Sequence, residues 1–400
     1  MEAYRLVSAN KGAPGIDEKS IEEFEADLKN NLYKLWNRMS SGSYFPKPVK
    51  GVEIPKKSGG ARLLGVPTVE DRIAQMVAKL NLEPLLEPIF CDDSYGYRRD
   101  KSAIEAVRAT RKRCWQYDWL IEFDIKGLFD NIDHKLLMKA VRKHTDCRWV
   151  ILYIKRWLKA PIKMPDATTS KRVSGTPQGS VISPILANLF MHYAFDRWME
   201  TKNPDNPWAR YADDGLIHCR SKEEALHVLR KLKERMKECN LMLHPDKTKI
   251  IYCKDANRKG EHENTAFDFL GYTFRTRLSR NRNGAYFASF SPAVSKNACK
   301  AFRERIRDIR KGSTHKSLEQ IASEMNLVIR GWANYFGHFR PSEMKNELCK
   351  VNLALVCWVI RKYKGFKRRK EKALDWLGSC AKTRPDLFYH WQMGIVPAAG

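Results

Sequence analysis

Apolar and polar residues follow two different periods in the first half of the chain. Residues 119–125 form a short apolar run typical of a buried strand, and residues 208–219 predict a strand, an acidic turn and a second strand. Helical spacing marks residues 223–239 and the stretch from Ser183 through Trp198, which has a proline in its first turn. Because strand, helix, hairpin and helix follow in this order, we expect an α+β domain with helices on one face of its sheet.

A hairpin is predicted near the N-terminus, and a helical region near the C-terminus. Residues 52–67 form two strand-like runs around a Ser-Gly-Gly turn with basic side chains on both arms, and Thr68 is expected to cap a helix. Residues 293–400 hold 22 Lys or Arg against 9 Asp or Glu and show no convincing strand pattern. We expect a separate basic helical domain there, with the aromatic residues between Trp332 and Phe339 packed in its core.

The charge of the whole chain limits its function. Its 400 residues include 73 Lys or Arg and 46 Asp or Glu, a formal net charge of +27. Such an excess repels itself in a compact chain unless an anionic partner binds, so nucleic acid is the leading partner and an anionic membrane surface the second. No apolar stretch approaches the roughly 20 residues that span a bilayer, and the N-terminus lacks the apolar core of a secretion signal.

The cysteines indicate neither a zinc module nor a disulfide framework. Ten are spread along the chain, and no two form a C-x-x-C pair. The ten histidines show no pair at the spacing of zinc ligands either. We therefore expect reduced cysteines in an intracellular protein, of cytoplasmic and bacterial type.

Three carboxylates are the strongest candidates for chemistry. Asp213 and Asp214 lie in the predicted turn between two apolar strands, where Asp is common without any function, but Asp124 stands near the end of a separate strand. If these strand ends converge, their oxygens suit Mg²⁺, which keeps waters and accepts substrate phosphates as further ligands. Two such ions about 3.5–4 Å apart clamp the attacking and leaving oxygens of a phosphoryl transfer. A basic chain would bind the polyanion on which this chemistry acts.

Seven ordered segments resemble the group II intron subfamily of reverse transcriptases. Tyr211-Ala212-Asp213-Asp214 resembles the Y-x-D-D box, residues 123–130 the box of the first catalytic aspartate, and residues 175–188 the box that faces template and nucleotide. Residues 11–17 resemble the N-terminal extension, residues 54–72 the fingers, residues 269–272 the primer grip, and residues 331–336 the thumb or maturase domain. The resemblance runs in the same order from about residue 4 to residue 391.

This resemblance implies a right-hand polymerase, with fingers and palm around an antiparallel sheet and an α-helical thumb. Its domains would be the N-terminal extension and fingers (1–90), the palm with a helical insertion and the catalytic sheet (91–292), and the thumb or maturase domain with a short basic tail (293–400). It implies an RNA-directed DNA polymerase that uses two Mg²⁺ ions and dNTPs to copy an RNA template from a DNA primer. The enzyme would bind its intron RNA to promote splicing and would copy it into cDNA for retrohoming to target DNA. We expect no membrane partner, and we favour a monomer although the sequence leaves the oligomeric state open.

The resemblance also assigns roles to individual residues. The catalytic residues would be Asp124, Asp213 and Asp214, which bind the metal ions together with Ile125. The incoming nucleotide would contact Lys56, Arg62, Phe129 and Gln178. The nucleic acid would contact Tyr211, Ala212, Lys247 and Gly271. Independently of the resemblance, helical spacing places Lys300, Arg303, Arg307 and Arg310 on one basic face, which we also expect to contact nucleic acid. Phe129 would exclude a ribose 2′-hydroxyl and the small Ala212 would let nucleic acid approach, although Phe129 fits a core position equally well on the residues alone.

Two other functions stay open at this point. One is an RNA-binding splicing factor with a dispensable polymerase site, although an unused acidic cluster is electrostatically unfavourable. The other is a domesticated reverse transcriptase that serves DNA repair or defence. The sequence also lacks the paired cysteines of the endonuclease that many relatives carry at the C-terminus. We therefore expect the short class, which takes its primer from a nick or a replication fork.

Overall fold

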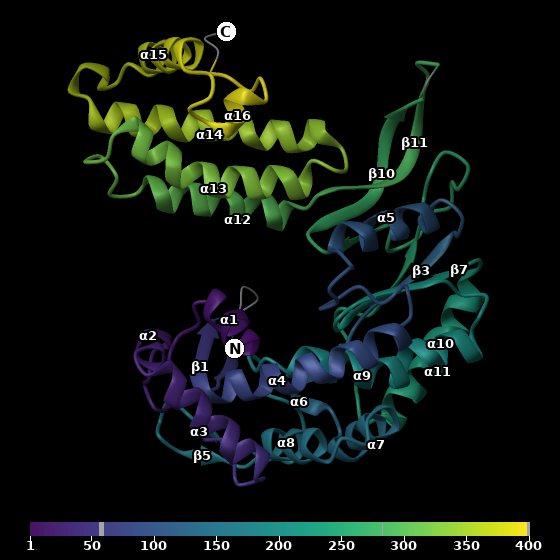
Figure 1. The fold of residues 1–400 in the computed structure, drawn as a ribbon. Coiled ribbons are helices and arrows are strands. Elements are labelled where there is room, and N and C mark those ends of the chain that lie inside the picture. The colour runs from purple at the N-terminus through teal and green to yellow at the C-terminus, as the bar shows by residue number, and fades with distance from the viewer. Residues whose placement is uncertain (56–59, 282, 398–400) are drawn as a thin grey trace. The chain divides into compact units, whose positions relative to one another are not determined.

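The chain forms a mixed α/β structure that divides into two compact units. The computed structural model describes residues 1–55, 60–281 and 283–397 (Figure 1). Unit 1 comprises residues 1–106 and 119–250, and unit 2 comprises residues 107–118 and 251–400. The division between the two units at residues 250–251 places strands β9 to β11 in the same unit as the C-terminal helices. The boundary predicted at residue 292 instead separates the palm from the thumb by their expected functions. The assignment to three domains therefore stays a prediction.

Unit 1 consists of helices around two four-stranded sheets. Its helical segments are α1 (Glu2–Ala9), α2 (Ile21–Glu25), α3 (Leu28–Ser40), α4 (Val69–Leu86), η1 (Glu87–Ile89), α6 (Leu128–Asn131), α7 (His134–His144), α8 (Arg148–Lys159), α9 (Ser183–Met191), η2 (His192–Asp196), α10 (Arg197–Lys202) and α11 (Lys222–Glu238). Its strands are β1 (Val49–Pro55), β2 (Ala61–Val66), β3 (Trp119–Asp124), β4 (Ile162–Lys163), β5 (Thr169–Ser170), β6 (Trp208–Tyr211) and β7 (Asp214–Cys219). Helix α5 (Ala103–Cys114) and strand β8 (Lys249–Tyr252) continue across the division into unit 2.

The first sheet contains the predicted N-terminal hairpin. Strands β1 and β2 pair antiparallel with Ile54 opposite Arg62, and the sheet order is β2-β1-β4-β5. The Thr68 side chain accepts a hydrogen bond from the Asp71 N–H at the start of α4, which confirms the predicted cap. The turn of the hairpin, with Lys56, lies outside the described residues.

The second sheet has the order β6-β7-β3-β8, and β7 pairs antiparallel with both β6 and β3. Helix α11 packs on β3 and β7, and Phe195 of η2 contacts the rings of Phe123 and Trp208. The single helix expected from Ser183 through Trp198 is interrupted, because η2 is a π-helical turn between α9 and α10. A π-turn inserts one residue into the helical repeat and so changes which side chains face the sheet.

Unit 2 combines a three-stranded antiparallel sheet with a helical bundle. Its strands are β9 (Ala266–Phe269), β10 (Tyr272–Arg280) and β11 (Tyr286–Val294), in the order β11-β10-β9. Its helical segments are α12 (Lys296–Arg310), α13 (Leu318–Phe336), α14 (Pro341–Lys362), η3 (Lys364–Phe366), α15 (Lys370–Thr383) and α16 (Tyr389–Gln392). The buried rings of Phe336 and Phe339 pack on Tyr272, which confirms the expected aromatic core. Within the described part of the chain, no helix has both the length and the apolar character needed to cross a bilayer.

Candidate active site at the turn between β6 and β7

Antiparallel pairing brings the three predicted catalytic aspartates together. Asp124 is the last residue of β3 and Asp214 the first of β7, and the two are direct partners across the ladder. Asp213 occupies the turn between β6 and β7, and its carbonyl accepts a hydrogen bond from the Ile125 N–H at 3.2 Å. Side chains directly opposite in an antiparallel pair lie about 5 Å apart, so like charges there repel unless a cation intervenes. The register therefore favours the binding of a cation between these carboxylates.

The pKa values of two of these aspartates reflect the same repulsion. Although Asp214 is exposed by surface area, partial desolvation, followed by the charges of Asp213 and Asp124, raises its carboxyl pKa to about 7. Burial and then the charge of Asp124 raise the pKa of Asp213, while Arg62 and Lys247 oppose this rise. Asp213 and Asp214 therefore hold their protons more tightly than ordinary aspartates do.

Lys247 places a positive charge beside the acid cluster. Its ammonium nitrogen lies 2.7 Å from Oδ2 of Asp124, and this hydrogen bond is the main reason that its pKa is raised. The sequence assigned Lys247 to nucleic-acid contact, but in this structure it pairs with a predicted metal ligand. The three carboxylates themselves fit a hard divalent cation such as Mg²⁺, which takes oxygen ligands.

The predicted nucleotide residues lie on segments that pack against one another. The Gly65 N–H of β2 donates to the Gln178 carbonyl at 2.7 Å, and the Thr176 N–H donates to the Phe129 carbonyl at 2.6 Å. Position 175 requires glycine, since its φ is +75° and a Cβ there would lie 2.5 Å from the Phe129 carbonyl oxygen. The loop of residues 175–180 thus joins the β2 strand to the Phe129 segment.

Phe129 is half-buried rather than a core residue, and it makes an edge contact with Tyr97 at a ring distance of 6.3 Å. Tyr97 has a left-handed φ of +58° and is 53% exposed. Burial and then the charge of Asp213 raise the Tyr97 pKa, whereas Arg62 lowers it. Tyr97 therefore belongs to the same neighbourhood as the acids, although a lone tyrosine in a loop carries no sequence signal for such a place.

The residues assigned to nucleic acid have diverse surroundings. Tyr211 is half-buried, and Ala212 is buried with a left-handed φ of +58°. Gly271 is the second residue of the tight turn between β9 and β10, where its φ is +82° and its carbonyl accepts from the Ser295 N–H. The backbone of Ala212 packs closely against Gly96, because a Cβ on Gly96 would lie 2.5 Å from the Ala212 nitrogen.

The basic residues of α12 are not all equally available. Arg303 forms an ion pair with Glu347 of α14 at 2.6 Å, and Lys300 lies 4.0 Å from Glu304. Arg307 and Arg310 line a groove of about 200 Å³ with apolar residues of α12 and α14. Three of the four predicted contacts thus remain better placed for an external anion than Arg303.

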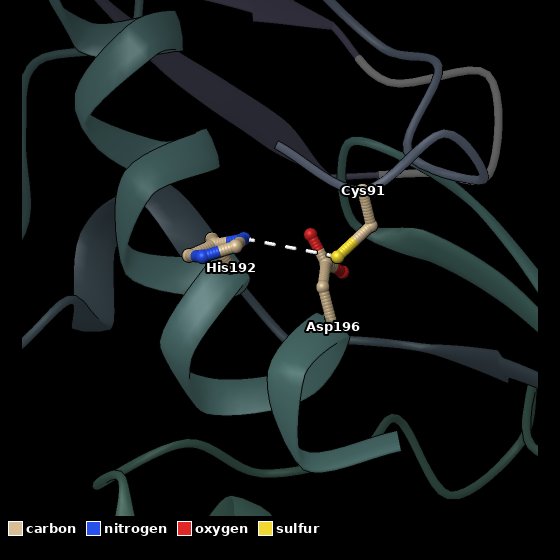
Figure 2. A group of neighbouring side chains, drawn as sticks. All are labelled: Cys91, His192 and Asp196. Atoms are coloured by element: carbon tan, nitrogen blue, oxygen red, sulfur yellow. Dashed lines mark hydrogen bonds between the residues drawn. The ribbon is translucent and has the colours of Figure 1, made fainter. Parts of the chain in front are cut away.

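A second cluster of possible metal ligands lies behind the β6–β7 turn. Cys91, His192 and Asp196 are buried, and Sγ of Cys91 lies 3.9 Å from Nδ1 of His192 (Figure 2). Burial, followed by the charges of Arg197 and Arg210, lowers the His192 pKa to about 4. A divalent cation would meet the same repulsion as this proton, and both Asp196 oxygens already accept hydrogen bonds from Arg210. The cluster is therefore better explained as the packing around a buried Arg210–Asp196 ion pair.

Comparison with known proteins assigns the chain to a family. Residues 54–274 match the family described as reverse transcriptase (RNA-dependent DNA polymerase), and residues 299–376 match the group II intron, maturase-specific domain. The first match includes all three clustered aspartates, and the second covers most of the helices of unit 2.

Individual relatives agree with this assignment. Protein YkfC of Escherichia coli is 31% identical over 320 residues, which cover 70% of this chain and 81% of the relative. The group II intron-encoded protein LtrA of Lactococcus lactis is 35% identical over 193 residues, 48% of this chain and 32% of LtrA. A putative COX1/OXI3 intron 1 protein of Saccharomyces cerevisiae is 32% identical over 202 residues, 50% of this chain and 24% of the relative. This chain therefore belongs to the family of group II intron-encoded reverse transcriptases, RNA-directed DNA polymerases that carry a maturase-specific domain.

Proposed function

We propose that the acid cluster at the β6–β7 turn is the centre at which this chain copies RNA into DNA. The observation that carries the proposal is the register that sets Asp124 opposite Asp214, with Asp213 in the adjoining turn. In the proposed right-hand arrangement, the β1–β2 hairpin belongs to the fingers, the β6-β7-β3-β8 sheet to the palm, and α12–α14 to the thumb.

Asp124, Asp213 and Asp214, with the carbonyl of Ile125, would hold two Mg²⁺ ions. When bound, these ions supply charge neutralisation at the reacting phosphate and lower the pKa of the primer 3′-hydroxyl. The chain's own contribution is geometry: Asp124 ends β3 and Asp214 begins β7, so the ladder sets their spacing, and Asp213 lies in the tight turn that the paired strands β6 and β7 enclose. Arg62 adds a cation whose charge acts on Asp213, which suits a residue that contacts a triphosphate.

Phe129 and Tyr97 would form the wall of the sugar pocket. Their rings make an edge contact, and the 175–180 loop holds the Phe129 segment through the hydrogen bond from Thr176. Both rings are partly exposed. Gln178 lies on that loop, and its side-chain amide donates to Asp130 at 3.3 Å. We propose that this wall excludes the 2′-hydroxyl of a ribonucleotide.

Unit 2 would bind the intron RNA and thereby promote its splicing. Its maturase match and its basic helix α12 support this assignment. Retrohoming would then join the two activities, because a protein bound to its intron RNA can copy that RNA at a DNA target. The partners in this proposal are the intron RNA, an RNA template with a DNA primer, and dNTPs.

Primer extension on an RNA template with dNTPs and Mg²⁺ tests the polymerase directly. We expect Asp213→Asn to abolish full-length cDNA, since losing a metal ligand removes several kcal/mol of transition-state stabilisation. Asp205→Asn is the matched control, because Asp205 is an exposed aspartate in the loop before β6 and should leave synthesis intact. Equal synthesis by Asp213→Asn and wild type would refute the proposed metal site.

The same variants separate polymerisation from splicing. Asp213→Asn should still accelerate splicing of the intron RNA if RNA folding depends on unit 2. A wild-type protein that splices but makes no cDNA would instead support the splicing-factor alternative. The absence of a structured intron around the coding region, found by sequencing its flanks, would favour a role in repair or defence.

A further inference from the structure

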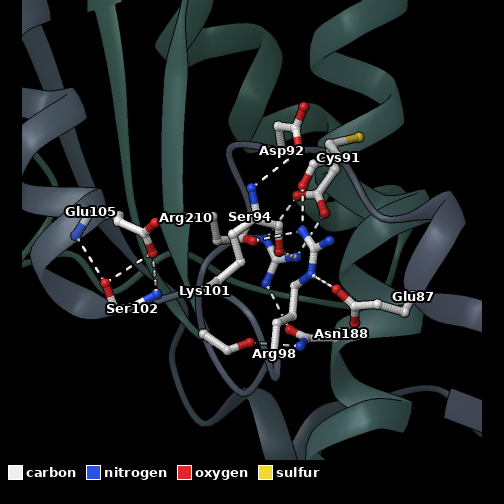
Figure 3. Close-up of polar contacts among 12 residues, drawn as sticks. Glu87, Cys91, Asp92, Ser94, Arg98, Lys101, Ser102, Glu105, Asn188 and Arg210 are labelled. Carbon is white, nitrogen blue, oxygen red and sulfur yellow. Dashed lines mark hydrogen bonds and ion pairs between the residues drawn. The ribbon is translucent and has the colours of Figure 1, made fainter.

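A buried arginine lies directly behind the catalytic turn. Arg210 is the third residue of β6, and its side chain is 0% exposed, as is that of Asp196. Figure 3 shows the guanidinium among side chains of the 91–98 loop and α9. A fully buried charge of this kind is costly unless every donor is satisfied, so its contacts reveal what it holds in place.

All five N–H donors of Arg210 are used. Two bonds of 2.7 Å join Nε and one terminal nitrogen to the two carboxylate oxygens of Asp196. A third, also of 2.7 Å, goes to the Ser94 hydroxyl, and a fourth of 3.2 Å to Oδ1 of Asn188. The fifth reaches the main-chain carbonyl of Ala212 at 3.0 Å. The fork therefore links α9, η2 and the 91–98 loop to the peptide that immediately precedes Asp213.

The hydrogen bond from Arg210 reaches Ala212, a residue with an unfavourable backbone conformation. Ala212 has a φ of +58°, which a residue with a Cβ adopts only when its surroundings determine it. Gly96 packs against its amide, and the Gly96 carbonyl is itself held by the Asn188 amide at 2.7 Å. The next carbonyl, that of Asp213, accepts from the Ile125 N–H. Arg210 and β3 thus fix the two consecutive peptides that orient the acids.

We propose that Arg210 is a positioning residue for catalysis: held by Asp196, it clamps the Ala212 peptide and so keeps Asp213 and Asp214 in the geometry that binds metal. This inference rests on the proposed function of the acid cluster. It acts through the backbone, so its effect should appear in metal affinity and in kcat and should spare the KM for primer and template.

A double substitution separates this role from stability. Arg210→Met alone leaves the Asp196 carboxylate buried without a partner, whereas Arg210→Met with Asp196→Leu replaces the ion pair by apolar side chains, which is often neutral for stability. We expect the double variant to fold with a thermal midpoint near that of wild type. It should bind Mn²⁺, measured by titration calorimetry, about 10-fold more weakly, and its kcat should fall about 10- to 100-fold at unchanged KM.

Unit 2 offers a matched control. Arg258 is a largely buried arginine that pairs with Asp255 and donates to the main-chain carbonyls of Cys114 and Tyr117. Arg258→Met with Asp255→Leu makes the same change in side chains at a place that does not support the catalytic turn. It should keep wild-type Mn²⁺ affinity and kcat.

A conservative variant covers the case in which the double variant does not fold. Arg210→Lys keeps a positive charge for Asp196 but lacks the fork that also reaches Ala212, so it should fold and still bind Mn²⁺ more weakly. Wild-type Mn²⁺ affinity in either folded Arg210 variant would overturn the proposal. If wild type made no cDNA but its Mn²⁺ affinity still depended on Arg210, the proposed polymerase function would fail while the clamp would stand.

Discussion

The ion pair between Lys247 and Asp124 makes Lys247 a competitor of the metal. Its ammonium lies on the carboxylate oxygen that a metal would use, yet the side chain is 61% exposed and free to withdraw. We predict that Lys247→Met strengthens Mn²⁺ binding by up to about 5-fold, the size expected of an exposed ion pair of up to about 1 kcal/mol. Titration calorimetry measures this, and Lys249→Met, which removes an exposed charge on β8, is the control. Weaker binding by Lys247→Met would contradict the competition.

Phe129 tests the proposed sugar pocket. Phe129→Ala removes the ring that contacts Tyr97 and should let ribonucleotides enter, so discrimination against them should fall at least 10-fold. Phe129→Tyr keeps the bulk and should retain the preference. Competition between dNTPs and rNTPs in primer extension gives the ratio, and an unchanged preference in Phe129→Ala would leave the ring with a packing role.

His390 predicts how unit 2 responds to acid. Burial lowers its pKa to about 3, while Nε2 lies 2.7 Å from Oδ1 of Asn352. Because this folded-state pKa lies below the unfolded value of about 6.5, its contribution to stability is complete above pH about 6.5 and is lost as the pH falls towards 3. From this group alone we expect a loss of about 2 kcal/mol between pH 7.5 and pH 5. Urea unfolding should show a smaller loss in His390→Gln, and the full loss in a control with the exposed His315→Gln.

At the scale of elements, one tight turn joins β9 to β10. Leu270 and Gly271 both have positive φ, of 51° and 82°, which is the type I′ geometry that fits the twist of a two-residue hairpin. Gly271→Ala would add a left-handed Cβ 3.3 Å from the Phe336 ring and should destabilise unit 2 by about 1–2 kcal/mol.

Gly331 provides the opposite control in the same unit. It lies inside α13 with open space around its missing Cβ, so Gly331→Ala should stabilise the protein by up to about 1 kcal/mol. Denaturant unfolding of both variants gives the comparison. Equal effects of the two substitutions would show that the turn geometry does not decide the stability of this hairpin.

At the scale of the whole molecule, the net charge of +27 favours binding of any polyanion. A dedicated RNA-binding surface additionally needs basic side chains that lie together and accessible on one face. Replacing Lys300, Arg307 and Arg310 by Gln should weaken intron RNA binding and reduce the slope of log affinity against log salt by about one for each lost phosphate contact. Arg303 is left in place because its pair with Glu347 would otherwise be broken.

A triple variant of α11 removes the same charge elsewhere. Arg230, Lys233 and Lys237 are exposed on that helix, and their replacement by Gln should change affinity and slope less. Equal losses in both triple variants would mean that RNA binding follows net charge and that α12 is no dedicated surface.

Many of the helices and strands could be predicted from the local sequence. The runs at residues 119–124 and 208–219 form strands because they are short, largely continuous apolar stretches of strand length, and the Thr68 cap works within one helical turn. The interruption of the helix after Met191 was not predicted, since the apolar pattern of these residues does not mark a π-turn. The hairpin of β10 and β11 was also missed.

The sequence by itself determined that this chain is a basic, nucleic-acid-binding protein with an acidic turn of the reverse transcriptase kind, because charge and motif spacing are local properties. Only the tertiary structure decided that Asp124 faces Asp214, that Lys247 pairs with Asp124, and that Arg210 supports the turn. These contacts join residues 90 or more positions apart, except where Arg210 reaches Ala212, and strand register and burial create them. No pattern in neighbouring residues encodes such distances, which is why the chemistry of the site emerges only once the chain has folded.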